Sequence, residues 1–164
     1  MAPRIGWQID PFGHSATQAR LFAEMGFDAM FFARADYQDK ARRVASREME
    51  FLWQPHYKNV FRRVEIFTHI LYSHYHEPEG FCFGDEDPRC ASDEPIIDNP
   101  KSYDFNVERR AEELRKWILH MRRHYRTNNL FMVWGRDFQY QNAHKVFKNT
   151  NKLLEHFNEK YNDI

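Results

Sequence analysis

Residues 6 to 27 read GWQIDPFGHSATQARLFAEMGF, and this stretch indicates the fold class. It begins within an apolar run, residues 5 to 9, that predicts a buried strand. Asp10 ends the run, and a turn with a proline and a glycine follows. Ser15 then predicts a helix N-cap, and apolar residues recur at helical spacing up to Gly26, which predicts the C-cap. Asp10 is therefore expected at the carboxyl end of a strand, where open α/β sheets build their sites.

The same alternation of apolar runs and amphipathic segments continues along the chain. Strands are predicted near residues 5–9, 28–33, 64–71 and 130–134, and helices follow at 16–25, 37–53, 105–125 and 142–161. Residues 73–105 are predicted to form a long irregular loop, a kind of segment that is often functional. We therefore predict an α/β fold, with a mostly parallel sheet and helices on both of its faces.

The composition of the chain argues against several classes of function. The chain has 164 residues, enough for one domain, and a formal net charge of zero, which argues against nucleic acid or an anionic membrane as a partner. No apolar stretch approaches the roughly 20 residues of a membrane span. Residues 1–4 do not resemble a signal peptide, and the chain reaches a core strand almost at once. This start suggests a piece of a longer protein.

The two cysteines, Cys82 and Cys90, lie in a polar loop. Two free thiols are one interpretation. A disulfide is the other, and it would indicate an oxidising compartment. Composition does not decide between them.

Parallel topology brings the residues after each strand to one edge of the sheet. Those residues are Asp10, Arg34, Tyr75 and Asp137. An aspartate in a turn is by itself explained by its turn-forming propensity. Two carboxylates at equivalent strand ends, with an arginine between them in the sequence, favour a site in which one acid keeps its proton while the other is ionised. Glycoside hydrolysis requires that division.

Two segments resemble glycoside hydrolase family 38, the α-mannosidases. IDPFGHSATQARLFAEMGFDAMFFARADYQDK, residues 9–40, resembles the segment around the catalytic nucleophile. WGRDFQYQNAHKVFKNTNKLL, residues 134–154, resembles the acid/base segment. The resemblance extends over nearly the whole chain, is weakest in residues 73–105, and is closest to the lysosomal branch of the family.

The resemblance implies a role for individual residues. Asp10 matches the nucleophile, which in this family is also a zinc ligand, and Asp137 matches the general acid/base. Phe12 matches an aromatic residue beside the bound sugar. Arg34 and Tyr75 match an arginine and a tyrosine of the active site.

The implied activity is that of a retaining, zinc-assisted α-mannosidase that removes terminal α-linked mannose from N-glycan-type oligosaccharides, in a lysosome or outside the cell. The family takes its other zinc ligands from an upstream His-x-Asp motif and a downstream histidine, and neither segment occurs in residues 1–164. The chain is accordingly expected to be the middle part of the catalytic domain. The alternative is a catalytically inactive fragment or sugar-binding remnant.

Two positions depart from the family pattern. Gln8 stands where lysosomal-type sequences commonly have histidine, and Arg136 precedes the acid where a small or acidic residue is usual. An arginine beside Asp137 would favour the ionised form of that side chain, which works against an acid.

Several histidines are also candidate metal ligands. His120 and His124 have the i, i+4 spacing of a helical metal site, but arginines lie between them, and a solvated helix face is the preferred interpretation. His74 and His76 would need the loop to fold over the site. His14 is expected to pack at the start of a helix.

Overall fold

The computed structural model describes residues 2–55, 64–84, 88–90 and 94–161. The chain divides into two compact units. Unit 1 comprises Met1–Tyr75 and Met121–Phe131, and unit 2 comprises His76–His120 and Met132–Ile164.

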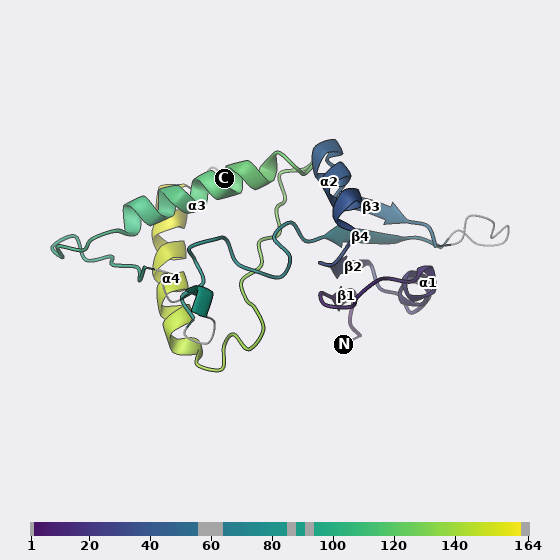
Figure 1. The fold of residues 1–164 in the computed structure, drawn as a ribbon, viewed down its shortest axis with the longest axis horizontal. Helices are drawn as coiled ribbons and strands as arrows, with labels where there is room; N and C mark the ends of the chain where they lie inside the picture. Colours follow the sequence, from purple (N-terminus) through teal and green to yellow (C-terminus); the bar gives the residue numbers. More distant parts are fainter. Residues whose placement is uncertain (1, 56–63, 85–87, 91–93, 162–164) are drawn as a thin grey trace. The chain divides into compact units, whose positions relative to one another are not determined.

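Unit 1 is built on a four-stranded sheet in the order β1-β2-β4-β3 (Figure 1). Its described strands and helices are β1 (Ile5–Gln8), α1 (Ala16–Glu24), β2 (Ala29–Phe32), α2 (Tyr37–Ser46), β3 (Glu50–Trp53) and β4 (Ile66–Ile70). Strands β1, β2 and β4 are mutually parallel, and β3 runs antiparallel to β4. The predicted α/β class and the mostly parallel sheet are confirmed.

Helix α1 begins as the sequence predicted, and its C-cap is Met25, one residue before the predicted Gly26. The Ser15 hydroxyl accepts a hydrogen bond from the Gln18 amide at 3.1 Å, and Gly26 follows the helix at a φ of +86°, which favours glycine. The Phe22 ring lies on Gly6 of β1, so closely that a Cβ at residue 6 would be 2.6 Å from it. The bare backbone of Gly6 thus allows α1 to pack on the sheet.

One row of side chains crosses all four strands on one face of the sheet. The register pairs Trp7 with Phe31, Phe31 with His69, and His69 with Glu50. The Phe31 and His69 rings stack at 4.9 Å, and the Tyr125 ring stacks on His69 at 5.3 Å. His69 is almost fully buried, and its Nδ1 lies 2.9 Å from a Glu50 carboxylate oxygen.

This burial predicts that acid destabilises unit 1. Burial lowers the pKa of His69, and Glu50 only partly opposes that effect. A histidine whose pKa is lower in the folded state binds its proton more readily when unfolded, so its contribution to stability is present above pH 6.5 and is lost as the pH falls below that value. We expect the free energy of unfolding to fall by up to about 1.4 kcal/mol per pH unit on this account.

The measurement is denaturant unfolding of the chain between pH 7.5 and 4.5, with His69→Gln as the test variant, because glutamine can still donate to Glu50. The variant should show a shallower pH dependence than the unsubstituted chain. His120→Gln, at an exposed histidine of another element, is the matched control and should keep the full slope. An unchanged slope in His69→Gln would exclude His69 as its source.

The predicted helix over residues 37–53 is wrong in its second half. Helix α2 ends at Ser46, because Arg47 takes a left-handed conformation at a φ of 58° and its amide bonds back to the Arg43 carbonyl. The apolar residues that follow form β3, which pairs with β4 through the register Phe51 to Thr68. This pairing partner comes later in the chain, so residues 47–53 alone do not reveal it.

The predicted strand over residues 130–134 is also wrong. This segment has no regular secondary structure, and the fourth strand of the sheet is β3 instead. The chain passes from unit 1 to unit 2 between Phe131 and Met132. Phe131 contacts the Phe31 ring at 5.2 Å, whereas Met132 and Trp134 pack on the core of unit 2. The apolar run is therefore divided between two cores.

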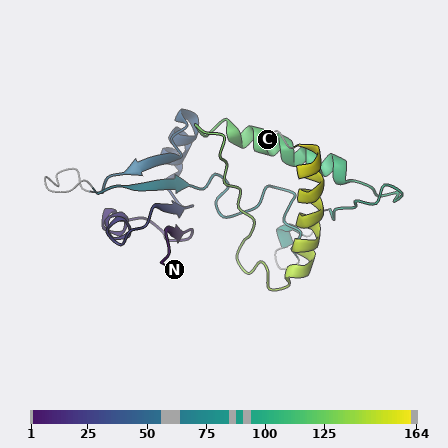
Figure 2. The ribbon, with the colours of Figure 1, turned by 180° about the vertical axis from the view of Figure 1, so that it is seen from behind.

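Unit 2 is organised by two helices with irregular segments packed on them (Figure 2). They are α3 (Val107–Arg122), which continues into unit 1 at its last turn, and α4 (Ala143–Lys160). The apolar stripe of α3 is buried as predicted, and the core cluster comprises Phe81, Phe83, Ile96, Val107, Ala111, Leu114, Leu153 and Phe157. Phe147 of α4 is exposed.

Residues 73–105 contain one short 3₁₀ helix, Pro88–Cys90, and are otherwise irregular where they are described; residues 85–87 and 91–93 lie outside the described residues. Among the helices that the structure describes, none has the length and apolar character that crossing a bilayer requires.

Candidate active site

The register of the parallel strands places Asp10 and Arg34 at one edge of the sheet. Gln8, Phe32 and Ile70 are aligned across β1, β2 and β4, so the residues that follow each of them emerge at the same level. Asp10 and Arg34 are each two residues beyond this row. The alignment of the strands therefore brings Asp10 and Arg34 together, as the sequence predicted.

Arg34 is the centre of this edge. Its Nε donates to Asp10 Oδ1 at 2.6 Å, and its Nη2 pairs with the same oxygen. The guanidinium lies over the Phe12 ring, 4.6 Å from the ring centre. The hydrogen bond to Asp10 is the largest cause of the raised pKa of Arg34, with the Tyr75 hydroxyl adding to it. Charge and cation–π contact together hold the turn after β1 against the end of β2.

Tyr75 completes the group from the segment after β4. Its ring is buried, and its hydroxyl donates to Asp10 Oδ1 at 3.4 Å. Asp10 itself is exposed, and Phe12 has 86% of its surface exposed. A carboxylate held from one side and open to solvent on the other is suited to meet a ligand.

The His14 side chain packs against the end of β2 and thereby holds the turn after β1. Its Nε2 lies 2.8 Å from the Arg34 carbonyl oxygen, and its ring packs against the Phe32 ring with the two ring centres 4.1 Å apart. This agrees with the expectation that His14 packs at the start of α1.

The Asp10 carboxylate is hydrogen-bonded through one of its two oxygens. Its hydrogen bonds from described residues go to Oδ1, which leaves Oδ2 as an oxygen that a cation could take. Zinc in proteins is held by four ligands, or by three and a water. Among the described residues, Asp10 belongs to no cluster of three ligating side chains, so it would supply one ligand of such a site.

A cavity of about 730 Å³ opens beside Arg34 and Phe12 within unit 1. This volume falls within the usual range of ligand pockets, about 300–1,000 Å³. Aromatic side chains line it together with charged groups, and the lining includes Phe32, Phe51, Trp53, Asp36, Asp39 and Arg43. Aromatic faces beside carboxylates give this cavity both an apolar and a hydrogen-bonding surface.

Asp137 lies in unit 2 and is exposed. The segment before it is irregular, so the expectation that Asp137 ends a parallel strand is wrong. Its pairing with Asp10 stays a prediction.

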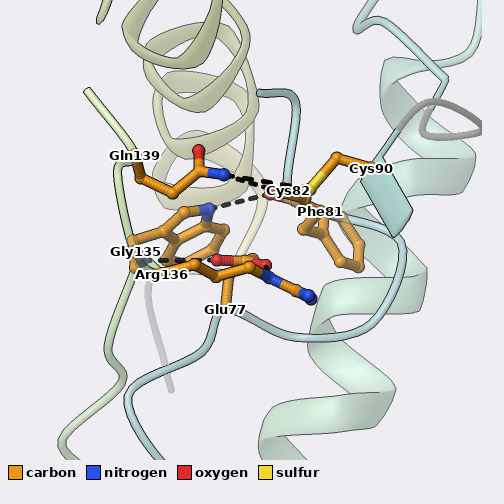
Figure 3. Close-up of a disulfide and its surroundings, with 8 residues drawn as sticks. Glu77, Phe81, Cys82, Cys90, Gly135, Arg136 and Gln139 are labelled. Atoms are coloured by element: carbon orange, nitrogen blue, oxygen red, sulfur yellow. Dashed lines mark hydrogen bonds and ion pairs between the residues drawn. A yellow bond between two sulfur atoms is a disulfide. The ribbon is translucent and has the colours of Figure 1, made fainter. Parts of the chain in front are cut away.

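Arg136, beside Asp137, is bound to a carboxylate that the sequence reasoning missed. Its Nε forms an ion pair with Oε1 of Glu77, whose side chain has only 1% of its surface exposed (Figure 3). The positive charge that departs from the family pattern is therefore compensated by a buried negative one. No spacing rule links residues 77 and 136, because the contact joins segments 59 residues apart.

Cys82 and Cys90 form a disulfide, with their Cα atoms 5.3 Å apart. Among the described residues, one cluster of three ligating side chains is found, and it consists of Glu77 and these two cysteines. Zinc binds cysteine as the thiolate, so bonded sulfurs do not provide that site. This cluster does not fit a metal in the disulfide form.

Among the residues that the structure describes, His120 and His124 belong to no cluster of three ligating side chains. Helix α3 ends at Arg122, so His124 lies beyond it, with its ring stacked on Tyr72 and its Nδ1 3.3 Å from the Val44 carbonyl oxygen. His120 is exposed on α3.

Unit 1 is thus an α/β unit that presents an arginine-bound aspartate and an exposed aromatic side chain at the carboxyl edge of its parallel strands. Comparison with known proteins identifies the family to which this chain belongs. The model of the glycosyl hydrolases family 38 N-terminal domain matches residues 1–163, and the chain belongs to this family.

The relatives in this family are α-mannosidases by name. The chain is 45% identical over 156 residues to the lysosomal alpha-mannosidase of Dictyostelium discoideum, covering 95% of the chain and 15% of that protein. It is 44% identical over 153 residues to the lysosomal alpha-mannosidase of Cavia porcellus, and 43% identical over 156 residues to that of Homo sapiens, each covering 93% of the chain and 15% of the relative. The chain thus spans about 15% of the length of these relatives.

Proposed function

We propose that residues 1–164 form the middle part of the catalytic domain of a retaining α-mannosidase. The substrate would be a terminal α-linked mannose on an N-glycan-type oligosaccharide, and the enzyme would work in a lysosome or outside the cell. The family membership and the names of the relatives support this proposal. The disulfide is consistent with an oxidising compartment.

The observation that carries the proposal is the environment of Asp10. An exposed carboxylate is held on one oxygen by Arg34 and Tyr75, at the sheet edge where α/β proteins place their sites. Phe12 is exposed in the same turn, and its ring would stack on the sugar. The carboxylate is therefore fixed in direction while its outer face stays open to a substrate.

In the proposed reaction, the Asp10 carboxylate attacks the anomeric carbon of mannose as the glycosidic C–O bond breaks. Asp137 gives its proton to the leaving oxygen. In the second step Asp137 takes a proton from water, the water oxygen attacks the anomeric carbon, and the ester bond to Asp10 breaks. This sequence retains the anomeric configuration and requires the two carboxyl groups to be about 5–5.5 Å apart.

The zinc ion that the family resemblance implies would be held in part by Asp10, through the oxygen that Arg34 and Tyr75 leave open. When bound, zinc would bind the sugar hydroxyls and act as a Lewis acid. Arg34 then keeps Asp10 oriented by fixing its other oxygen.

The experiment uses the native full-length protein that carries these 164 residues, supplied with zinc and an aryl α-mannoside. We expect hydrolysis with mannose released as the α-anomer, because two inversions at the anomeric carbon give retention. NMR of the first-formed product reads the configuration directly. Release of the β-anomer would contradict the roles given to the two aspartates. Sugar binding without hydrolysis would favour the alternative, a sugar-binding remnant that uses the cavity of unit 1.

A further inference from the structure

Asp137 sits in a turn whose preceding residues are held by one buried carboxylate. The Gly135 amide donates to Glu77 Oε2 at 3.3 Å, and Arg136 pairs with Glu77 Oε1 (Figure 3). Both donors come from the two residues directly before Asp137. The two oxygens of Glu77 thus fix the path of the backbone as it enters the turn.

This carboxylate is deeply buried. The Glu77 side chain is 1% exposed and that of Arg136 is 15% exposed, so the ion pair is largely shielded from water. A buried carboxylate without its partner is strongly unfavourable, which means that Glu77 and Arg136 hold each other in place. An ion pair of this kind restrains the residues that carry it far more than an exposed one does.

The residues after Asp137 are held by the disulfide. The Gln139 side-chain amide lies 3.7 Å from Cys82 Sγ and 4.0 Å from Cys90 Sγ. Its other end packs on Gly84, where an added Cβ would be 2.3 Å from Gln139 Oε1. The turn is therefore anchored on both sides of its exposed aspartate.

A further bond closes the turn on itself. The Tyr140 hydroxyl donates to the Trp134 carbonyl oxygen at 2.7 Å, and the Trp134 indole donates to the Phe81 carbonyl oxygen at 2.9 Å. Residues 134 and 140 are thereby joined to each other and to the segment that follows Glu77. Asp137 projects from a loop whose base is tied to the core of unit 2.

We propose that Glu77 is a positioning residue for Asp137, acting through its ion pair with Arg136. The proposal rests on the acid/base role proposed above for Asp137. The pair aims the acid by fixing the two residues before it, and it sets a buried negative charge against the arginine next to the acid. Glu77 and Arg136 then act together as one ion pair, which explains how this chain accommodates an arginine at residue 136.

The kinetic test compares two α-mannosides on the native full-length protein. One has an alkyl leaving group, which needs a proton from the acid, and the other has a dinitrophenyl leaving group, which does not. Glu77→Gln is expected to lower kcat/KM on the alkyl mannoside by about 10²-fold, the cost of a misplaced catalytic group. On the dinitrophenyl mannoside, kcat/KM should change by less than about 3-fold, because bond cleavage there needs no acid.

Three variants serve as references. Asp137→Ala should give the same split between the two substrates, only larger. Glu79→Gln makes the same chemical change at an exposed glutamate two residues away and should leave both rates unchanged. Glu77→Gln combined with Arg136→Gln should lose no more activity than Glu77→Gln alone, because residues that act as one pair are not additive.

A second readout needs no turnover. Amide hydrogen exchange of residues 132–141 in the 164-residue chain should accelerate at least about 10-fold in Glu77→Gln, while the amides of α4 keep their protection. Unchanged exchange, or an equal loss of rate on both mannosides, would overturn the positioning role. Should the unsubstituted protein hydrolyse neither mannoside, the proposed function fails, and the exchange experiment still decides whether Glu77 anchors the turn.

Discussion

Replacing Asp10 by asparagine is expected to lower kcat/KM of the native full-length protein on an aryl α-mannoside by at least about 10⁴-fold. An amide cannot form the glycosyl ester, and it also removes the negative charge that Arg34 holds in the structure. A steady-state assay at saturating zinc measures the loss. A fluorinated mannosyl fluoride, which forms a slowly hydrolysed glycosyl-enzyme, should label Asp10 in the unsubstituted protein and should label no carboxylate in the variant.

Asp28→Asn is the matched control for this experiment. Asp28 is also an exposed aspartate paired with an arginine 24 residues away, Arg4, and it immediately precedes β2 at the opposite end of the strand from Arg34. The same chemical change at that end should leave kcat/KM within about 2-fold, since surface pairs contribute little. Near-normal turnover in Asp10→Asn, or labelling of another carboxylate, would remove Asp10 from the chemistry.

The isolated 164-residue chain is expected to hydrolyse aryl α-mannosides at least about 10³-fold more slowly than the native full-length protein. The reason is the number of zinc ligands. Asp10 offers one carboxylate, and among the described residues it joins no other pair of ligating side chains. One carboxylate in water binds zinc weakly, so neither the metal nor the sugar would be held.

Two measurements check this expectation. Calorimetric titration of the chain with zinc should show no saturation at micromolar concentrations, and Asp10→Asn should leave the titration almost unchanged. The full-length protein should bind zinc tightly in the same buffer, and Asp10→Asn should weaken that binding. Robust turnover by the 164 residues alone would show that they hold a complete site.

The local features of the fold could be predicted from sequence because neighbouring residues decide them. Ser15 and Gly26 delimit α1 through short-range backbone chemistry, and the apolar stripe of α3 repeats at the helical period. Parallel strands end at one edge, so the proximity of Asp10 and Arg34 followed from topology alone. The resemblance to family 38 supplied their proposed roles.

The errors came where the partner is distant in sequence. Residues 50–53 form a strand because β4 provides a pairing edge, and their apolar pattern alone fits a helix or a strand. Residues 130–134 have the composition of a strand. Phe131 packs in unit 1 and Trp134 in unit 2, so these residues do not join the described sheet. Both apolar segments are too short for their periodicity to distinguish a helix from a strand. Their secondary structure therefore depends on the tertiary environment.

The sequence by itself determined the α/β class, the capped helix after β1 and the strand-end position of Asp10, since each depends on residues a few positions apart or on the general rule for parallel strands. Only the tertiary structure decided what surrounds Arg136. The Glu77 carboxylate reaches it from 59 residues earlier in the chain, and the disulfide beside Gln139 comes from the same region. A buried ion pair forms where folding brings two charges together away from water. The sequence around either residue predicts neither the partner of that residue nor its burial.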